Sequence, residues 1–232
     1  WTKFRLLYTL VIKRMMNQGG VLRKHFDSPD LPLREDLDLG WTPKSLTDDQ
    51  LQLFVDRLCG PNMGKNPNKG KTYRWIPNHL QDGNGRVLPR SMVRLFELAA
   101  EIESDHQKAE WPTLLHHTSL RAAIERVSES RVQELEEEFP WIKSVRTALQ
   151  QKKPEVPIVR TKLQSLLEIE WGDTGDRPPE TSGRELLKIL LDLGVFYLRT
   201  DDSRVDVRDL YLKGFGLWRR GGVAQPTSVK RG

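Results

Sequence analysis

The sequence predicts a mainly α-helical fold, with a helical bundle over residues 1–150 and a smaller α+β domain over residues 151–223. Two observations lead to this prediction. Apolar residues recur every three or four positions through much of the first 150 residues, which is the period of an amphipathic helix. Two short runs of β-branched, aromatic and aliphatic residues near the C-terminus flank a polar turn, as in a β-hairpin. Residues 224–232 are expected to form a disordered basic tail.

Composition indicates a soluble globular chain with a polar bias: 37% of the 232 residues are hydrophobic, 30% are charged, and the net charge is +5. The single cysteine, Cys59, has no partner for an internal disulfide, and the chain has no cysteine cluster to bind zinc. The apolar first segment contains Arg5, Lys13 and Arg14 and is too short to span a bilayer. We therefore expect a cytoplasmic location without membrane contact. Because the chain begins at Trp1, we also expect it to be part of a longer polypeptide.

The first half of the chain divides into helices and loops. Residues 1–18 are apolar on nearly every face, which predicts a helix buried on several sides and ended by Gly19. A polar loop is expected from there to Pro43. Thr47 and Gln50 have the spacing of a capping box and predict a helix that starts after Thr47. A basic loop over residues 60–71 leads to residues 73–76, which are expected to form a strand or an extended segment.

Two long helices follow, over residues 89–105 and 120–139, and Pro89 is suited to the first turn of the earlier one. Pro140 begins another element. After a short linker over residues 152–157, helices are predicted over residues 159–168 and 180–193, with Gly194 as the stop. The hairpin pairs residues 195–198 with 205–207 around the turn at residues 201–203. Three helices followed by a hairpin are the pattern of a winged-helix domain.

Gly70-Lys71-Thr72 begins like a phosphate-binding loop, but its spacing excludes that motif. The motif needs a glycine five positions before Gly70, so that successive backbone N–H groups surround a phosphate. That position holds Lys65, and Gly64 is one place too far away. Thr72 is also expected to lead into an extended segment rather than a helix. We interpret this segment as a solvated basic loop ahead of a docking strand.

A second candidate site lies just beyond this loop, where Arg86 follows Gly85 and Arg90 lies in the first turn of a helix. A guanidinium fork at such a position suits a pair of phosphate oxygens. The alternative for Arg90 is an ion pair with a neighbouring carboxylate.

Several short motifs resemble the region downstream of the ATPase domain in large bacterial P-loop ATPases. They are Thr72-Tyr73-Arg74-Trp75, His79-Leu80-Gln81-Asp82-Gly83, Gly85-Arg86, Pro89-Arg90-Ser91, Phe139-Pro140-Trp141 and Leu193-Gly194-Val195. The helix start at Arg90 also resembles the helical lid of AAA+ and STAND-like signal-transduction ATPases. The resemblance implies a lid-like region followed by a winged helix, with Arg90 and Arg86 contacting a nucleotide.

The same resemblance implies that ATP and Mg²⁺ belong to an upstream domain or a partner chain, and that this chain holds no cofactor or metal of its own. It further implies a non-catalytic regulatory or interaction region, in phage defence or another conflict system. An independent enzyme finds no support in the sequence, because His79 and the pair His116-His117 lack catalytic partners at useful spacing.

The alternative function is binding of double-stranded DNA. The helix over residues 180–193 and the hairpin each carry a net charge of −1, so the winged helix is a poor surface for phosphates. Basic patches elsewhere and two cations of the helix are the candidate contacts: Lys65, Lys69, Lys71, Arg74, Lys143, Arg146, Lys152, Lys153, Arg184 and Lys188.

Overall fold

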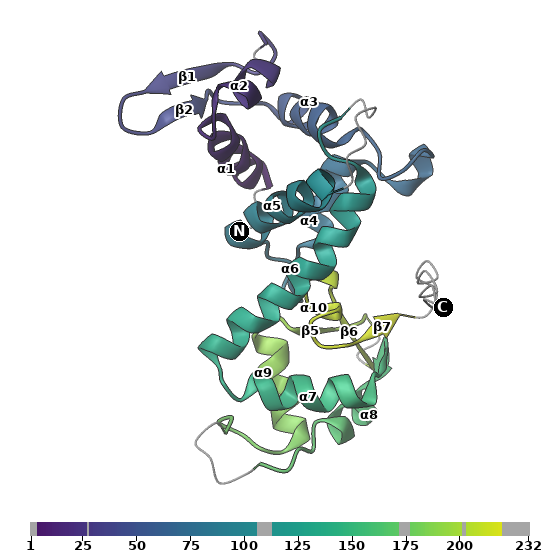
Figure 1. The fold of residues 1–232 in the computed structure, drawn as a ribbon. Coiled ribbons are helices and arrows are strands. Elements are labelled where there is room, and N and C mark those ends of the chain that lie inside the picture. Colours follow the sequence, from purple (N-terminus) through teal and green to yellow (C-terminus); the bar gives the residue numbers. More distant parts are fainter. Residues whose placement is uncertain (1–3, 27, 106–112, 172–176, 201–202, 220–232) are drawn as a thin grey trace, which may run out of the picture.

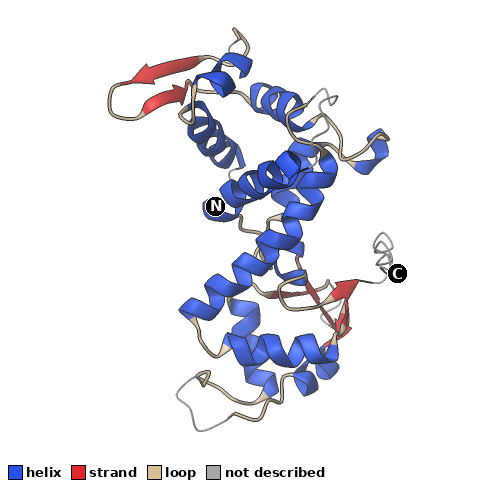
Figure 2. Ribbon diagram, in the orientation of Figure 1, coloured by secondary structure: helices blue, strands red, loops and turns tan. Residues whose placement is uncertain are grey.

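The computed structural model describes residues 4–26, 28–105, 113–171, 177–200 and 203–219. Helices dominate it, so the expected mainly α class is confirmed (Figures 1 and 2). The molecule is elongated, with an N-terminal part and a C-terminal part joined by one long helix, α6 (His117–Glu138). The tail expected over residues 224–232 lies outside the described residues.

The N-terminal part contains α1 (Phe4–Met16), α2 (Gly20–Phe26), the hairpin β1 (Leu33–Asp36) and β2 (Gly40–Pro43), and α3 (Asp48–Cys59). A short 3₁₀ turn, η1 (Pro67–Lys69), lies in the basic loop before α4 (Thr72–His79) and α5 (Pro89–Asp105). The capping box of α3 is confirmed, since Thr47 and Gln50 bond each other's backbone N–H. The start of α5 at Pro89 is confirmed as well.

The polar loop expected before Pro43 is wrong, because this segment contains α2 and an antiparallel hairpin that pairs Leu33 with Pro43. The hairpin turn is closed by Asp36, whose Oδ1 accepts hydrogen bonds from the N–H groups of Asp38 and Leu39. Gly40 then supplies the left-handed backbone, with φ of 66°. A side chain that bonds the backbone two residues later is an Asx-turn signal.

The extended segment expected at residues 73–76 is also wrong, because these residues lie in helix α4. Pro77 has no N–H to donate to the carbonyl of Tyr73, four residues earlier, and such a loss normally disfavours a helix. The hydroxyl of Tyr8 on α1 donates to that carbonyl at 2.6 Å instead. A contact from a distant helix therefore satisfies the group that the proline leaves free.

The C-terminal part begins with α7 (Ile142–Lys152), the short strands β3 (Glu155–Val156) and β4 (Ile158–Val159), and α8 (Arg160–Leu166). It continues with α9 (Gly183–Asp192), β5 (Phe196–Leu198), β6 (Arg204–Val207), α10 (Asp209–Leu212) and β7 (Trp218–Arg219). The expected hairpin is confirmed, and β4 adds to it in an antiparallel sheet of order β4-β6-β5. β3 pairs in parallel with β7.

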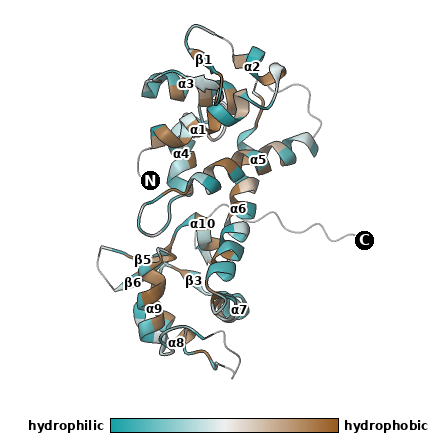
Figure 3. Ribbon diagram, turned by 90° about the vertical axis from the view of Figure 1, so that its left-hand side faces the viewer, coloured by the Kyte–Doolittle hydropathy of each residue, from teal (hydrophilic) through white to brown (hydrophobic). Residues whose placement is uncertain are grey.

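Helix α6 is common to both parts, since it packs against α5 and also against α10 and α7 (Figure 1). Its contact with α10 is close, because the N–H of Gly214 donates to the buried hydroxyl of Ser128 at 2.9 Å. A Cβ at Gly214 would lie 2.5 Å from the carbonyl oxygen of Ser128. Figure 3 shows α6 as mixed in hydropathy and α9 as largely hydrophobic, as expected for a helix that is covered on several sides.

Candidate functional site

The turn between α4 and α5 presents the two arginines that the sequence predicts to contact a nucleotide. Asp82 is buried, and its Oδ1 accepts hydrogen bonds from the N–H groups of Asn84 and Arg86, at 2.9 Å and 2.8 Å. Gln81 and Val87 form an isolated β-bridge on either side of this turn. We call residues 81–90 the arginine turn. Hydrogen bonds within the turn stabilise it, and its last residues begin α5.

Both arginines of this turn are accessible. The side chain of Arg86 is exposed, and that of Arg90 is 77% exposed. Arg90 forms the ion pair that was the alternative for this residue, with Nη1 3.3 Å from Oε1 of Glu134 on α6. The other oxygen of Glu134 accepts from Arg131 at 3.0 Å. An ion pair at such an exposed guanidinium contributes little to stability, so Arg90 remains available to a ligand.

The arginine turn contacts the C-terminal part directly. The N–H of Gly83 donates to the carbonyl of Gly194 at 2.6 Å, and the side-chain amide of Asn84 donates to the carbonyl of Asp192 at 3.2 Å. Gly194 has φ of 74°, and a Cβ there would lie 2.9 Å from Nδ2 of Asn84. The C-terminal end of α9 and the start of β5 are thereby fixed against the arginine turn.

A second polar contact between the two parts includes His79, at the end of α4. Its Nε2 lies 3.4 Å from a carboxylate oxygen of Asp209 on α10, and its Nδ1 lies 2.8 Å from the carbonyl of Trp75. Asp209 also pairs with Arg219, which reaches the buried Asp206 at 3.5 Å. Both ring nitrogens of His79 thus have structural partners, as expected for a partly buried histidine. This network connects elements rather than arranging a nucleophile and a base.

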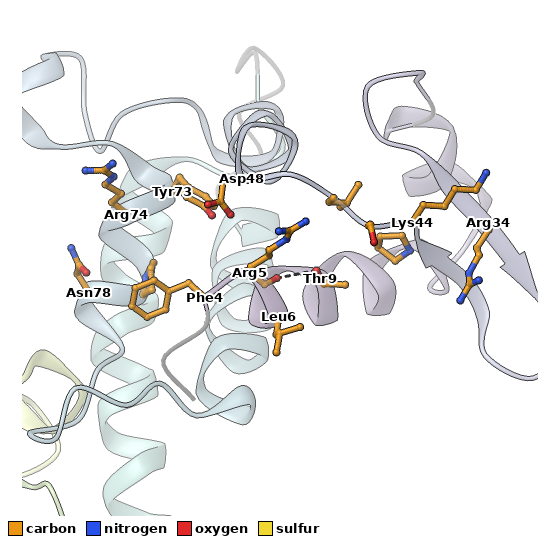
Figure 4. Close-up of a pocket in the computed structure, with 14 residues that line it drawn as sticks. Phe4, Arg5, Leu6, Thr9, Arg34, Lys44, Asp48, Tyr73, Arg74 and Asn78 are labelled. Atoms are coloured by element: carbon orange, nitrogen blue, oxygen red, sulfur yellow. Dashed lines mark hydrogen bonds between the residues drawn. The ribbon is translucent and has the colours of Figure 1, made fainter.

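A groove with a volume of about 1270 Å³ lies in the N-terminal part (Figure 4). It is bounded by the start of α1, the hairpin, the segment leading into α3, and α4. Four cationic side chains line it: Arg5, Arg34, Lys44 and Arg74. Asp48 is its one acidic residue. We call this feature the basic groove.

The cations predicted to contact DNA are distributed over the whole molecule. Arg74 lies in the basic groove, and Lys65, Lys69 and Lys71 are exposed on the neighbouring loop. On and just after α7, Lys143, Lys152 and Lys153 are exposed, while Arg146 is half-buried and paired with Glu136 at 3.2 Å.

On α9, Arg184 and Lys188 both lie within 4.0 Å of Glu185, which offsets part of their charge. The other cations of the basic groove, Arg5, Arg34 and Lys44, were not among the predicted contacts. They come from segments far apart in the sequence, and no local motif indicates that they converge.

The structure also bears on the loop that resembles a phosphate-binding motif. The expectation that Thr72 does not lead into a helix is wrong, because α4 begins there. The backbone groups of the loop are nevertheless occupied: the N–H of Thr72 donates to Pro61, and the N–H of Met63 donates to Gly70. These groups do not form the row of free N–H donors that surrounds a phosphate.

Two absences hold for the residue ranges that the structure describes. Within those ranges, no three His, Cys, Asp or Glu side chains are grouped so that they could hold a metal ion. None of the described helices is long and apolar enough to cross a membrane.

Comparison with known proteins identifies no relative of this chain. No protein-family model matches the chain, and neither a curated protein nor a solved structure matches it significantly.

Proposed function

We propose that this chain is a non-catalytic regulatory and interaction region of a bacterial P-loop ATPase, cytoplasmic and acting in phage defence or another conflict system. In this proposal the N-terminal part is lid-like, and ATP and Mg²⁺ are bound by an upstream domain or a partner chain. The motifs between Thr72 and Val195 support it through their resemblance to such ATPases. The role is one of relaying nucleotide state, not of chemistry.

We further propose that the C-terminal part, over the expected residues 151–223 together with the preceding α7, forms a winged helix. The order α7, β4, α8, α9, β5, β6 and the antiparallel sheet order β4-β6-β5 support this assignment. In a DNA-binding winged helix, α9 would enter the major groove. Its cations Arg184 and Lys188 share Glu185, and Asp192 lies at its end. Contact with protein is therefore the role that we assign to this domain.

The observation that carries the proposal is the contact between the arginine turn and the end of α9. The hydrogen bonds from Gly83 to Gly194 and from Asn84 to Asp192 join a nucleotide-facing turn to the winged helix. A displacement of Arg86 or Arg90 by a γ-phosphate would thus move a segment that continues into β5. Coupling of this kind needs two sites and a physical connection between them, and the turn supplies the connection.

The experiment is an ATPase assay on the assembly of this chain with its P-loop domain, in one polypeptide or two. We expect Arg90→Ala and Arg86→Ala each to lower kcat or raise KM for ATP about tenfold or more, because a fixed cation near a phosphate is lost. Arg94→Ala is the matched control: it lies one turn further along α5, where it pairs with Glu97 and Glu101. Equal kinetics for all three variants would contradict the proposed nucleotide contact.

Binding of double-stranded DNA remains the second candidate function. The exposed cations on the basic loop and around α7 favour it, because phosphate contacts supply most non-specific affinity. Its test is duplex binding as a function of salt. Affinity that is absent even at low salt would eliminate this candidate.

A further inference from the structure

The basic groove has a composition that the proposed ATPase association does not explain. Arg74 and Asn78 lie on α4 at one end of it, and Arg34 and Lys44 lie at the hairpin at the other end (Figure 4). Arg5, on the first turn of α1, lies between them. The cations therefore form a row along the groove rather than a single cluster.

These four cations are free to bind an anion. All four side chains are exposed, and none forms an ion pair with a described carboxylate. Arg14, Arg57 and Arg94 of the same N-terminal part are by contrast each paired with a carboxylate. A row of exposed like charges along a groove attracts a polyanion.

The one carboxylate in the groove is already engaged. Asp48 is the first residue of α3, where the helix dipole favours a negative charge. Burial raises the pKa of Tyr73, and the neighbouring Asp48 carboxylate, which accepts a hydrogen bond from the phenol, raises it further. The tyrosine is therefore protonated at neutral pH, and its hydroxyl is a partner of the Asp48 carboxylate.

Aromatic rings accompany the cations. Phe4 and Tyr73 line the groove and are half-buried, and the ring of Tyr73 is supported from behind by Tyr8, with centroids 4.8 Å apart. Proteins that bind single-stranded nucleic acid commonly combine cations along the phosphate backbone with aromatic rings on which the bases stack.

The size of the groove suits a polymeric ligand better than a small molecule. Pockets that hold a drug-sized ligand measure roughly 300–1,000 Å³, and this groove measures about 1270 Å³. It is a recess bounded by the start of α1, the hairpin, the segment leading into α3, and α4, and a flexible single strand can follow such a recess more readily than a rigid duplex. We propose that the basic groove binds the phosphate backbone of a single-stranded nucleic acid, with bases against Phe4 and Tyr73. This inference does not depend on the association with an ATPase.

The experiment measures fluorescence anisotropy of labelled 20-nucleotide dT and rU strands, a 20-base-pair duplex and a poly-glutamate peptide, each titrated with the full chain at several salt concentrations. If the four cations neutralise four phosphates, the logarithm of affinity falls with the logarithm of salt concentration with a slope of about −2.8. Single-strand affinity should then fall about 50-fold between 50 and 200 mM salt. The comparison of dT with rU identifies which sugar is preferred.

The variant Arg5→Gln/Arg74→Gln removes two of the four groove charges. The slope of its single-strand affinity against salt should be about −1.4, so that its affinity falls only about sevenfold between 50 and 200 mM salt. Arg160→Gln/Lys162→Gln is the control with equal charge loss, on exposed residues of α8 in the C-terminal part. Circular dichroism and thermal melting check that both variants fold. The proposal is overturned if no strand binds at 50 mM salt, if both double variants lose equal affinity, or if the duplex or the peptide binds the groove more tightly than the single strands.

Discussion

At the scale of single residues, Gly194 lies where the two parts of the molecule contact each other, beside Asp82 and Asn84 of the arginine turn. Gly194 and Gly85 have almost the same left-handed backbone, with φ of 74° and 73°. A Cβ at Gly85 would meet nothing within 4 Å, whereas one at Gly194 would crowd Asn84 and lie 3.1 Å from Cγ of Asp82. The pair therefore separates the cost of backbone strain from the cost of steric overlap.

We expect Gly85→Ala to lower the free energy of unfolding by about 1 kcal/mol, which is the left-handed backbone cost. Gly194→Ala should lower it by the same amount plus about 1–3 kcal/mol for overpacking against the arginine turn. Urea denaturation of both variants measures the difference. Equal destabilisation would mean that the turn does not press against Gly194.

The two arginines predicted to contact a nucleotide show how much a single position reveals in a sequence. Arg86 and Arg90 are found by their place after glycine and proline, because such turns project a side chain outward. The structure confirms that both are exposed but leaves their role as a prediction. Arg5 and Arg34 carry no comparable local signal, because their grouping depends on how α1 and the hairpin pack.

At the scale of elements, the close contact of α6 with α10 holds the C-terminal part to the long helix. The hydroxyl of Ser128 is buried and accepts the N–H of Gly214. Ser128→Ala should lower the free energy of unfolding by about 1–3 kcal/mol, because it leaves a buried N–H without a partner. Ser130→Ala, at a half-buried position two residues later whose hydroxyl donates to the carbonyl of Arg126, should change it by less than about 0.5 kcal/mol. Thermal or urea denaturation that ranks the two variants in the opposite order would contradict this account of the contact.

Elements with local start signals were predictable. The capping box at Thr47 and the proline at the start of α5 gave boundaries that the structure confirms. Helix α4 was not predictable in this way, because Pro77 argues against a helix and the compensating hydrogen bond comes from Tyr8, 65 residues away from Tyr73. The first hairpin had a signal in Asp36 and Gly40, but its strands are four residues each and only partly buried, so their apolar pattern is weak.

At the scale of the whole molecule, the fold consists of two parts with different electrostatic character around one shared helix. The N-terminal part holds the row of unpaired cations, and the C-terminal part presents an α9 surface whose cations share Glu185. The basic groove joins residues 4–9, 34–48 and 73–78, so it exists only in the folded chain. Long-range convergence of this kind is not encoded in any single segment of the sequence, which is why the groove could not be predicted.

In the proposed function, the two parts have different partners. A nucleotide-binding domain would face the arginine turn, and the proposed winged helix would carry the response to a protein partner. The hydrogen bonds of Gly83 and Asn84 are the route between them. In this proposal, the state of the nucleotide alters the end of α9 and the start of β5.

Hydrogen exchange on the assembly of this chain with its P-loop domain tests that claim most directly. Amides at residues 192–198, which follow the contact with the arginine turn, should exchange at different rates with ATP and with ADP. The difference should disappear in the Arg86→Ala/Arg90→Ala variant and persist in Arg94→Ala. Exchange at residues 192–198 that is the same with ATP and ADP in the unaltered assembly would contradict the account.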